Sequence, residues 1–176
     1  MTGYSMTLSL NVLNHLGINL YSNVPAILAE VVANAWDADA ETVTVEIASD
    51  HSSIVITDDG HGMTAADINE KFLTVGYQRR EVKGEARTPK FNRRVMGRKG
   101  IGKLCLFSIA DEVEVQSARD GERNGFTMKL SAIREKIKSG TGTYEPDALS
   151  ADQVNVTQGT RIVLRNLRKK LTNAEH

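Results

Sequence analysis

Four short clusters of glycine, acidic and amide residues constrain this chain more than its composition does, because their spacing suits few backbones. Residues 30–38 hold an acidic residue and an amide four positions apart within a largely apolar stretch. Residues 58–63 and 97–103 place glycines two or three positions apart, and Gly159 is followed by Thr160. Glycine permits tight turns and close backbone approaches that other residues resist. We therefore expect the four clusters to meet in one pocket.

Length and hydrophobic periodicity favour one domain that mixes helices with strands. The chain has 176 residues, a typical size for one compact domain. The predicted helices are 23–36, 64–72 and 101–110. The predicted strands are 42–47, 53–57, 111–117, 125–130 and 159–165, with a hairpin turn at 119–122. Residues 1–20 are expected to form an arm or a short helix, and residues 138–158 a loop. Several hairpin-like strand pairs favour an α+β fold over a doubly wound parallel sheet.

The charged residues are balanced overall but unevenly placed. Lys plus Arg and Asp plus Glu each number 22, so the net charge gives no general reason to expect a nucleic-acid or membrane partner. Residues 79–103, however, hold ten basic and two acidic residues, a net charge of +8. Such a run is ordinarily a solvated loop, and residues 74–99 lack periodicity, so we expect a long mobile loop there. Because the run leads into a glycine cluster, it also indicates an anion-facing role.

Cysteine use and the first residues indicate the compartment. The single cysteine, Cys105, excludes an internal disulfide and is expected to be a small core residue between two leucines. The chain does not start like a signal peptide, and no apolar run is long enough to span a membrane. We therefore expect a soluble, cytoplasmic protein without a membrane partner.

Within the first cluster, Glu30 and Asn34 lie four residues apart, so a helix stacks their side chains on one face. We expect Ile27 and Val31 to share that face with Asn34. A carboxylate beside the terminal phosphate of a nucleotide orients and deprotonates the attacking water. An amide oxygen one turn away holds magnesium, which takes few protein ligands besides phosphates and waters. The alternative is an exposed acid and a polar residue of an ordinary helix. We favour the nucleotide site because Asn34 lies among apolar residues, where its amide needs a partner.

In the second cluster, Asp58 ends an apolar strand and precedes Gly60 and Gly62. A carboxylate at a strand end can accept a hydrogen bond from the exocyclic amine of adenine, and the two glycines let a planar base approach the backbone. The alternative is a glycine-rich turn in which Asp58 caps the helix that begins at Thr64. Thr64 and Asp67 themselves have the spacing of a capping box.

The third cluster, residues 97–103, nearly matches the P-loop pattern G-x-x-x-x-G-K-[ST]. Leu104 stands where that pattern needs a hydroxyl to bind magnesium, and a basic loop rather than a buried strand precedes the cluster. Glycine amides at a helix N-terminus nevertheless form an anion site through their free N–H groups and the helix dipole. The cluster therefore predicts phosphate binding without a P-loop fold.

Together the clusters resemble the motifs of the GHKL ATPase family, or Bergerat fold, which includes DNA gyrase B, heat-shock chaperones, histidine kinases and MutL. The family's N-box, E-x-x-x-N-x-x-D-A, matches Glu30, Asn34, Asp37 and Ala38. Its two glycine boxes match the second and third clusters, and its Gly-Thr pair matches the fourth. The resemblance covers about residues 20–167. Within the family, the residues of the first and third clusters are most similar to those of MORC-like and bacterial chaperone-like ATPases.

The resemblance implies a two-layer α/β sandwich with a mixed, mostly antiparallel sheet, helices on one face and ATP against one face. Residues 1–20 would be an N-terminal arm, 21–170 the ATP-binding domain with a lid at about 74–99, and 171–176 a tail that leads to a following domain. ATP and magnesium are the implied cofactors, with Glu30 as the catalytic residue and Asn34 as the magnesium ligand. The residues implied to contact the nucleotide are Asn34, Asp37, Asp58, Gly60, Gly62, Met63, Gly97, Gly100, Ile101, Gly102, Lys103 and Thr160.

These expectations combine into one functional hypothesis. The domain would bind and hydrolyse ATP, and its nucleotide state would drive lid closure and homodimerisation of a larger protein, whose other domains would bind a nucleic acid or a protein client. The alternatives are a nucleotide-gated interaction module with negligible hydrolysis and a protein kinase of the histidine-kinase type. The histidine-kinase branch usually lacks the N-box glutamate, so Glu30 favours hydrolysis over phosphotransfer. Several family members complete their site with a cation from a following domain.

Overall fold

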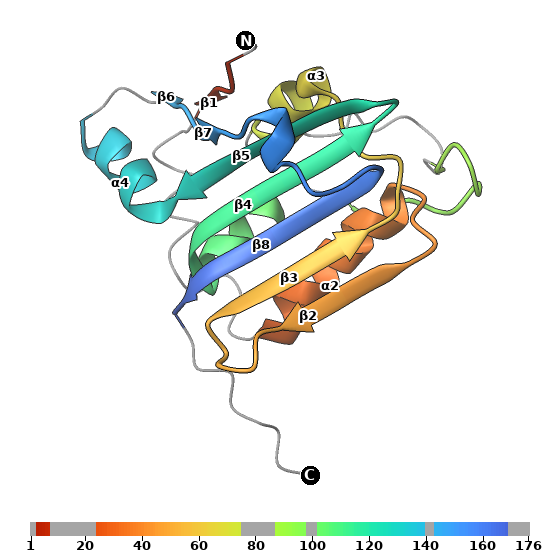
Figure 1. Cartoon of the computed structure of the whole chain (residues 1–176), viewed down its shortest axis with the longest axis horizontal. Helices are drawn as coiled ribbons and strands as arrows, with labels where there is room; N and C mark the ends of the chain where they lie inside the picture. Colours follow the sequence, from red (N-terminus) through yellow and green to blue (C-terminus); the bar gives the residue numbers. More distant parts are fainter. Residues whose placement is uncertain (1–2, 8–23, 75–86, 98–101, 140–142, 169–176) are drawn as a thin grey trace.

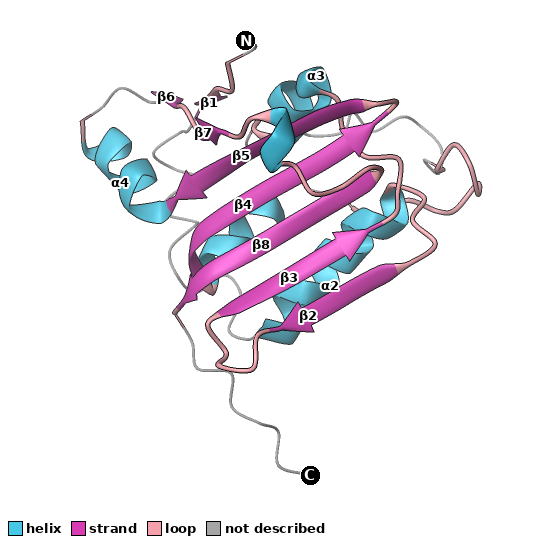
Figure 2. Ribbon diagram, in the orientation of Figure 1, coloured by secondary structure: helices cyan, strands magenta, loops and turns pink. Residues whose placement is uncertain are grey.

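The computed structural model describes residues 3–7, 24–74, 87–97, 102–139 and 143–168. Its centre is a six-stranded sheet in the order β2-β3-β8-β4-β5-β7, in which every pair of described strands is antiparallel. The strands are β2 (Val43–Ile47), β3 (Ser53–Asp58), β4 (Ala110–Arg119), β5 (Glu122–Lys129), β7 (Asp147–Ala148) and β8 (Gly159–Leu167). The last strand, β8, lies between β3 and β4 and so joins the two halves of the chain in one sheet (Figure 1, Figure 2).

Two helices, α2 (Val24–Asp37) and the 3₁₀ helix η2 (Gly102–Ser108), lie on the same face of the sheet (Figure 1). Shorter elements complete the fold: α3 (Ala65–Asp67), the π-helical turn η1 (Ile68–Phe72), α4 (Leu130–Lys138) and the 3₁₀ turn η3 (Ala151–Gln153). A separate ladder pairs β1 (Met6–Thr7) with β6 (Thr143–Tyr144). The sheet and its helices form two layers, which confirms the predicted α+β fold. Among the described residues, no helix is both long and apolar enough to cross a membrane.

The core lies between the central strands and the two helices. Ile54 and Ile56 of β3 lie opposite Leu164 and Ile162 of β8, so the four side chains share one face of the sheet. All four are buried, and burying an isoleucine or leucine side chain contributes about 1.5–3 kcal/mol. The buried residues of α2 are Ile27, Val31 and Ala35, and Cys105 of η2 is buried as predicted.

The predicted inner face of α2 is wrong at one position. Asn34 is exposed to solvent, and Ala35 is buried in its place. Steps of four residues from Ile27 through Val31 lead to position 35, so the side chain at position 34 turns toward the edge of the buried face. The boundaries of the helix were otherwise predicted to within about a residue, as is usual at helix ends.

Three other segments differ from their predictions. The helix expected over 101–110 is a 3₁₀ helix that ends at Ser108, and Ala110 already belongs to β4. Residues 130–138 form α4, although no element was predicted over 131–137; its nine residues mix four charged with four apolar ones, so the helical pattern is short. The loop expected over 138–158 contains β6, β7 and η3, each only two or three residues long.

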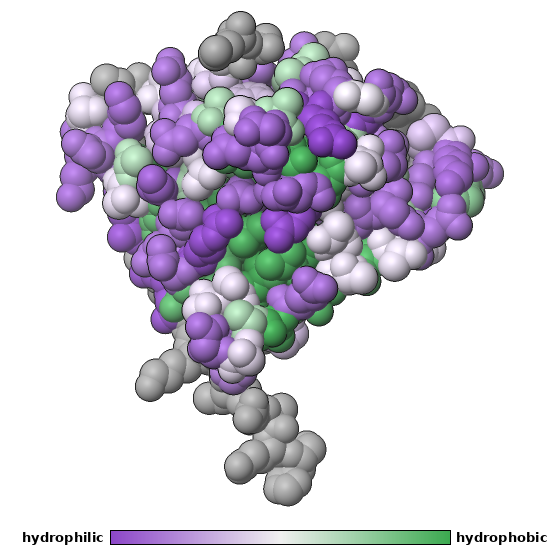
Figure 3. All heavy atoms as spheres, in the orientation of Figure 1, coloured by the Kyte–Doolittle hydropathy of each residue, from purple (hydrophilic) through white to green (hydrophobic). Residues whose placement is uncertain are grey.

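Strand register builds an ion-pair network on the face of the sheet turned away from α2. Arg165 Nη1 lies 2.8 Å from Glu114 Oε2 and 3.3 Å from Glu112 Oε1. Gln116 Nε2 donates a hydrogen bond to Glu114 Oε1 at 2.6 Å. Figure 3 shows this face, on which an apolar area over β3 and β8 is bordered by hydrophilic residues. Glu114 is buried, and these partners compensate its carboxylate for the loss of water.

Candidate functional site

Four polar residues stand at one level of four neighbouring strands, and we call them the polar row. Asp58 of β3 lies opposite Thr160 of β8, which lies opposite Ser117 of β4, which lies opposite Asn124 of β5. Residues opposite each other in an antiparallel ladder point to the same face. Since Asp58 follows Ile56 by two positions, the polar row points to the side of the sheet that carries α2. The row therefore closes one end of the core.

Asp58 is the acidic end of the polar row. Its Oδ1 accepts a hydrogen bond from the backbone N–H of Gly60 at 2.9 Å. Burial raises the pKa of the Asp58 carboxyl above its ordinary value, although the backbone amides of Gly60 and Thr160 partly offset this effect. Asp58, predicted to read adenine, and Thr160, predicted to contact the nucleotide, are thus neighbours on adjacent strands.

The glycines of the second and fourth clusters are required by contacts within the protein. Gly62 has a φ of +67°, and a Cβ there would lie 2.1 Å from the carbonyl oxygen of Ala118 in β4. Gly159 has a φ of +85°, and its Cβ would lie 2.1 Å from the carbonyl oxygen of Asp58. Both positions combine a left-handed backbone with close approach to a neighbouring chain segment. The sequence pointed to close approach of a ligand, whereas the structure shows close approach of protein backbone.

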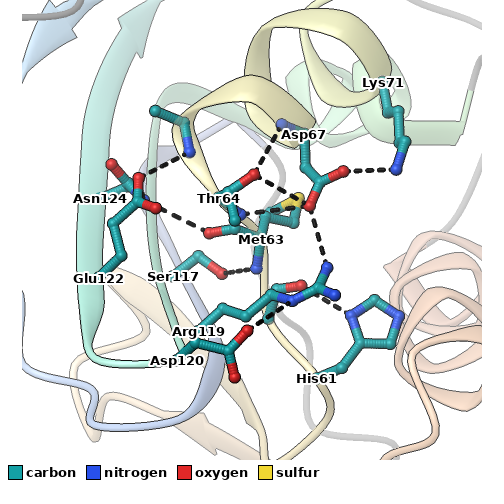
Figure 4. Close-up of polar contacts among 12 residues, drawn as sticks. His61, Met63, Thr64, Asp67, Lys71, Ser117, Arg119, Asp120, Glu122 and Asn124 are labelled. Atoms are coloured by element: carbon teal, nitrogen blue, oxygen red, sulfur yellow. Dashed lines mark hydrogen bonds and ion pairs between the residues drawn. The ribbon is translucent and has the colours of Figure 1, made fainter.

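The far half of the polar row holds the loop that follows β3. Ser117 Oγ accepts from the backbone N–H of Met63 at 2.8 Å, and Asn124 Nδ2 donates to the Met63 carbonyl oxygen at 3.4 Å (Figure 4). Ser117 Oγ also donates to the Gly159 carbonyl oxygen at 3.0 Å and lies 3.3 Å from Thr160 Oγ1. Ser117 therefore joins the second cluster to the fourth.

The start of α3 decides between the two interpretations of Asp58. The Asp67 N–H donates to Thr64 Oγ1 at 3.1 Å, and the Thr64 N–H donates to Asp67 Oδ2 at 3.3 Å, which completes the predicted capping box. Arg119 Nη1 contacts the same carboxylate oxygen at 3.1 Å (Figure 4). The alternative in which Asp58 caps this helix is wrong, because Thr64 is the cap.

On the helix side, Glu30 is partly buried. Burial and the negative charge of Glu30 together raise the pKa of Cys105 to about 12. Helix α2, which carries Glu30, packs against η2, and η2 begins with Gly102 and Lys103 of the third cluster. Asn34, one turn further along α2, is exposed, so it does not share the buried face of Ile27 and Val31 as predicted. An exposed amide and a nearby carboxylate suit the phosphate end of a nucleotide with magnesium.

The C-terminal end of α2 holds residues 87–97, which we call the clamp segment. Asp37 Oδ1 accepts from the Met96 N–H at 2.7 Å, and Asp37 Oδ2 accepts from the Gly97 N–H at 2.9 Å. Trp36 Nε1 donates to the carbonyl oxygen of Arg94 at 3.0 Å. Part of the segment predicted to be a mobile loop is thus bound to α2 through backbone groups.

Asp39, just beyond α2, binds the same segment. Its carboxylate accepts from the backbone N–H groups of Lys90 at 2.7 Å and Phe91 at 3.2 Å. Burial opposes ionisation, but hydrogen bonds from Thr88, Lys90 and Phe91 outweigh it and hold the pKa of Asp39 below its ordinary value. The Arg93 guanidinium lies 4.5 Å from the ring centre of Phe91 and adds a cation–π contact.

A groove of about 480 Å³ opens between the clamp segment and the second cluster. Its lining residues are Asp39, Asp59, Gly60, His61, Pro89, Lys90 and Gln158. Asp59 Oδ1 accepts from the backbone N–H groups of Glu41 at 2.7 Å and Thr42 at 2.9 Å, and Asp39 holds the clamp segment. Both carboxylates thus serve the fold, and the groove is distinct from the polar row.

The structure unites part of the predicted site. It joins Asp58 with Thr160 and Asp37 with Gly97, whereas Gly100, Ile101 and the Lys103 side chain lie outside the described residues. Sequence reasoning missed Ser117, Asn124 and Asp39. A signal for Ser117 existed, because it is the polar member of the inward-facing positions 113, 115 and 117.

Comparison with known proteins adds an independent finding. The family described as "Histidine kinase-, DNA gyrase B-, and HSP90-like ATPase" matches residues 21–160. The chain is similar to "Putative type II restriction enzyme HgiDII" of Herpetosiphon aurantiacus, with 42% identity over 99% of this chain and 28% of that protein. It is also similar to "Chaperone protein HtpG" of Rickettsia canadensis, with 27% identity over 92% of this chain and 27% of that protein. For "Chaperone protein HtpG" of Mycobacterium avium, the identity is 28% over 83% of this chain and 25% of that protein. The chain thus spans about a quarter of the length of these relatives.

Proposed function

Because the match extends over most of its length, this chain belongs to the histidine kinase-, DNA gyrase B- and HSP90-like ATPase family, and we propose that it is a magnesium-dependent ATP-hydrolysing domain. Membership of the family supports ATP binding. The observation that carries the proposal is the pairing of Asp58 with Thr160 across from a helix that presents Glu30 and Asn34 one turn apart. In this proposal, acceptors for the base would lie on the sheet side of the site and the groups for phosphate chemistry on the helix side.

Base recognition is proposed for the sheet side. The Asp58 carboxylate, at the end of β3, would accept from the exocyclic amine of adenine, with Thr160 beside it. Gly60 and Gly62 would shape the loop that passes next to the base, and Met63 would contact it. The half-buried position of Asp58 supports this role, because a hydrogen bond to a partly desolvated carboxylate is stronger than one in water.

Phosphate chemistry is proposed for the helix side. Magnesium, when bound, would neutralise charge on the phosphates, and Asn34 would be its protein ligand. Glu30 would orient and deprotonate the attacking water. The glycine cluster from Gly97 to Lys103 would bind phosphate oxygens, and Asp37 would hold Gly97 in place through its backbone N–H. The exposed amide of Asn34 supports the metal assignment, since it is open to a ligand.

The clamp segment supports a proposal about closure. Its bond from the Gly97 N–H to Asp37 connects the third cluster to α2, so nucleotide binding at that cluster would strengthen or weaken this bond. We propose that this connection transmits the nucleotide state to lid closure and to homodimerisation of the larger protein. ATP-dependent dimer formation by the whole protein, measured by light scattering with a non-hydrolysable analogue and with ADP, tests this proposal.

A steady-state phosphate-release assay tests hydrolysis. We expect turnover that requires both ATP and magnesium, and Asn34→Ala should weaken magnesium-ATP binding more than binding of metal-free ATP. ATP binding with no phosphate release would instead favour the nucleotide-gated interaction module, and transfer of labelled phosphate to a protein would favour a kinase. Binding that is unaffected by a chelator would remove Asn34 from the metal site.

A DNA-directed role of the whole protein is the better supported of two contexts. The identity to the protein named a restriction enzyme is 42%, against 27% and 28% for the proteins named chaperones. We therefore propose that ATP turnover by the whole protein is coupled to an action on DNA rather than to protein folding. Stimulation of its ATPase activity by DNA, and none by an unfolded protein, is the expected result.

A further inference from the structure

The nucleotide site has a second layer of polar groups behind it, centred on Ser117. This residue is completely buried, yet its hydroxyl meets three partners, one from the loop after β3 and two from the start of β8. It lies 2.8 Å from the Met63 backbone nitrogen, 3.0 Å from the Gly159 carbonyl oxygen and 3.3 Å from Thr160 Oγ1. Three polar contacts on one small buried group leave little freedom for its proton.

The chemistry of these partners determines where each proton lies. A serine hydroxyl has one proton to donate and two lone pairs that accept. The Gly159 carbonyl can only accept, so the Ser117 proton goes there, and the Met63 N–H can only donate, so it fills one lone pair. The remaining contact, to Thr160, can be a hydrogen bond only if the Thr160 hydroxyl donates to Ser117.

The direction of that bond has a consequence for the neighbouring strand. When the Thr160 hydroxyl donates its hydrogen bond to Ser117, the Thr160 oxygen can only accept hydrogen bonds from any other partner. Asp58, opposite Thr160 on β3, is also an acceptor when ionised. Two acceptors side by side suit a ligand group that carries two N–H bonds and disfavour a carbonyl oxygen, which would face them without a proton.

We propose that Ser117 is a positioning residue that sets base specificity, by holding the Thr160 hydroxyl as an acceptor so that the site prefers a 6-amino purine to a 6-oxo purine. The proposal rests on the proposed function, because it assumes that Asp58 and Thr160 face the base. It goes further in assigning specificity to a residue that does not touch the ligand.

ATP and inosine triphosphate separate the two cases, because they differ at purine position 6 and its adjacent ring nitrogen. Calorimetry should show that the wild-type chain binds ATP more tightly. In Ser117→Ala the Thr160 hydroxyl is free to rotate and donate, so the preference for ATP should fall by roughly fivefold, the worth of one neutral hydrogen bond. Ser108→Ala, which changes a buried serine of η2 outside the polar row, should keep the preference.

A double-mutant cycle shows whether Ser117 acts through Thr160. Thr160→Val removes the hydroxyl and should lower the preference by itself, and adding Ser117→Ala should then change it no further. If Ser117→Ala lowers both affinities equally and leaves their ratio intact, the serine only supports the fold and the proposal is overturned. Should Ser117→Ala fail to fold, Thr160→Val decides, since an intact preference in that variant also overturns the proposal. A wild-type chain that binds neither nucleotide refutes the proposed function itself.

Discussion

The two sides of the proposed pocket place their functional groups in different ways. On the sheet side, strand register sets the polar row, and moving one member would require a shift of a whole strand. On the helix side, Asp37 and Asp39 hold the clamp segment through a few hydrogen bonds to its backbone. A register is changed only by breaking many bonds at once, whereas a few bonds can break and reform during a catalytic cycle. The sheet side therefore suits recognition, and the helix side suits chemistry and movement.

The largest effect should come from Glu30 on the helix side. Glu30→Gln keeps the shape but removes the base, so ATP turnover should fall by about 10²- to 10⁴-fold while ATP affinity stays near that of the wild type. Phosphate release and calorimetry measure the two quantities separately. Glu46→Gln, an exposed glutamate of β2, is the matched control and should leave both unchanged. Equal losses of turnover and affinity in Glu30→Gln would contradict the assignment of chemistry to the helix side and recognition to the sheet side.

On the sheet side, the next largest effect should be on stability. In Gly62→Ala a left-handed backbone, which costs about 1–2 kcal/mol for an alanine, combines with a Cβ placed 2.1 Å from the Ala118 carbonyl oxygen. Overpacking of this kind adds about 1–3 kcal/mol. Gly121→Ala shares the positive φ, at +83°, but its Cβ meets nothing within 4 Å, so only the first cost applies. Urea unfolding should rank the two variants in that order, and equal losses would mean that the loop yields to the added methyl group.

How well each region could be predicted depends on how far apart along the chain its interacting residues lie. The α2 helix, β3 and β8 were predicted because hydrophobic periodicity is local, and Thr64 with Asp67 because a capping box spans four residues. The insertion of β8 between β3 and β4 depends on pairing between distant segments, which no local pattern encodes.

The candidate site shows the same limit. Asp58 and Thr160 were predicted from motifs 102 positions apart, but Ser117 was not, since its role depends on contacts 54 and 42 residues away along the chain. The exposure of Asn34 was missed because its apolar neighbours Val32 and Trp36 are themselves exposed, at 42% and 41%. An apolar neighbour in sequence is therefore a weak indication of burial at a helix edge.

Recognition on the sheet side should respond to pH in a specific direction. Burial raises the pKa of Asp58, so on acidification this carboxylate becomes protonated at a higher pH than an ordinary aspartate. The ionised form of Asp58, which accepts a hydrogen bond from an amine, is then lost. As the pH is lowered, ATP affinity should therefore begin to fall at a pH above the range in which ordinary aspartates are protonated. Asp58→Asn should cost about 1–3 kcal/mol of ATP affinity at neutral pH and remove this part of the pH dependence. An unchanged pH profile in the variant would assign the titration to another group.

The smallest effects should separate the bonds that hold the clamp segment. Asp39 is buried and accepts two hydrogen bonds from backbone N–H groups. In Asp39→Asn, an amide group replaces one of the two carboxylate oxygens that face those donors, so the clamp segment should be less firmly held. Trypsin, which cuts after Lys90 and Arg93, should then cleave the segment faster. We expect roughly three- to tenfold faster cleavage, as for the loss of about one hydrogen bond. Glu41 is the matched control, because its carboxylate lies 2.7 Å from Lys90 Nζ but both side chains are 61% exposed. Exposed ion pairs contribute little, so Glu41→Gln should change the cleavage rate by less than about twofold. If the two variants are cut at the same rate, surface charge rather than backbone hydrogen bonding holds the segment, and the helix side loses the feature that distinguishes it from the sheet.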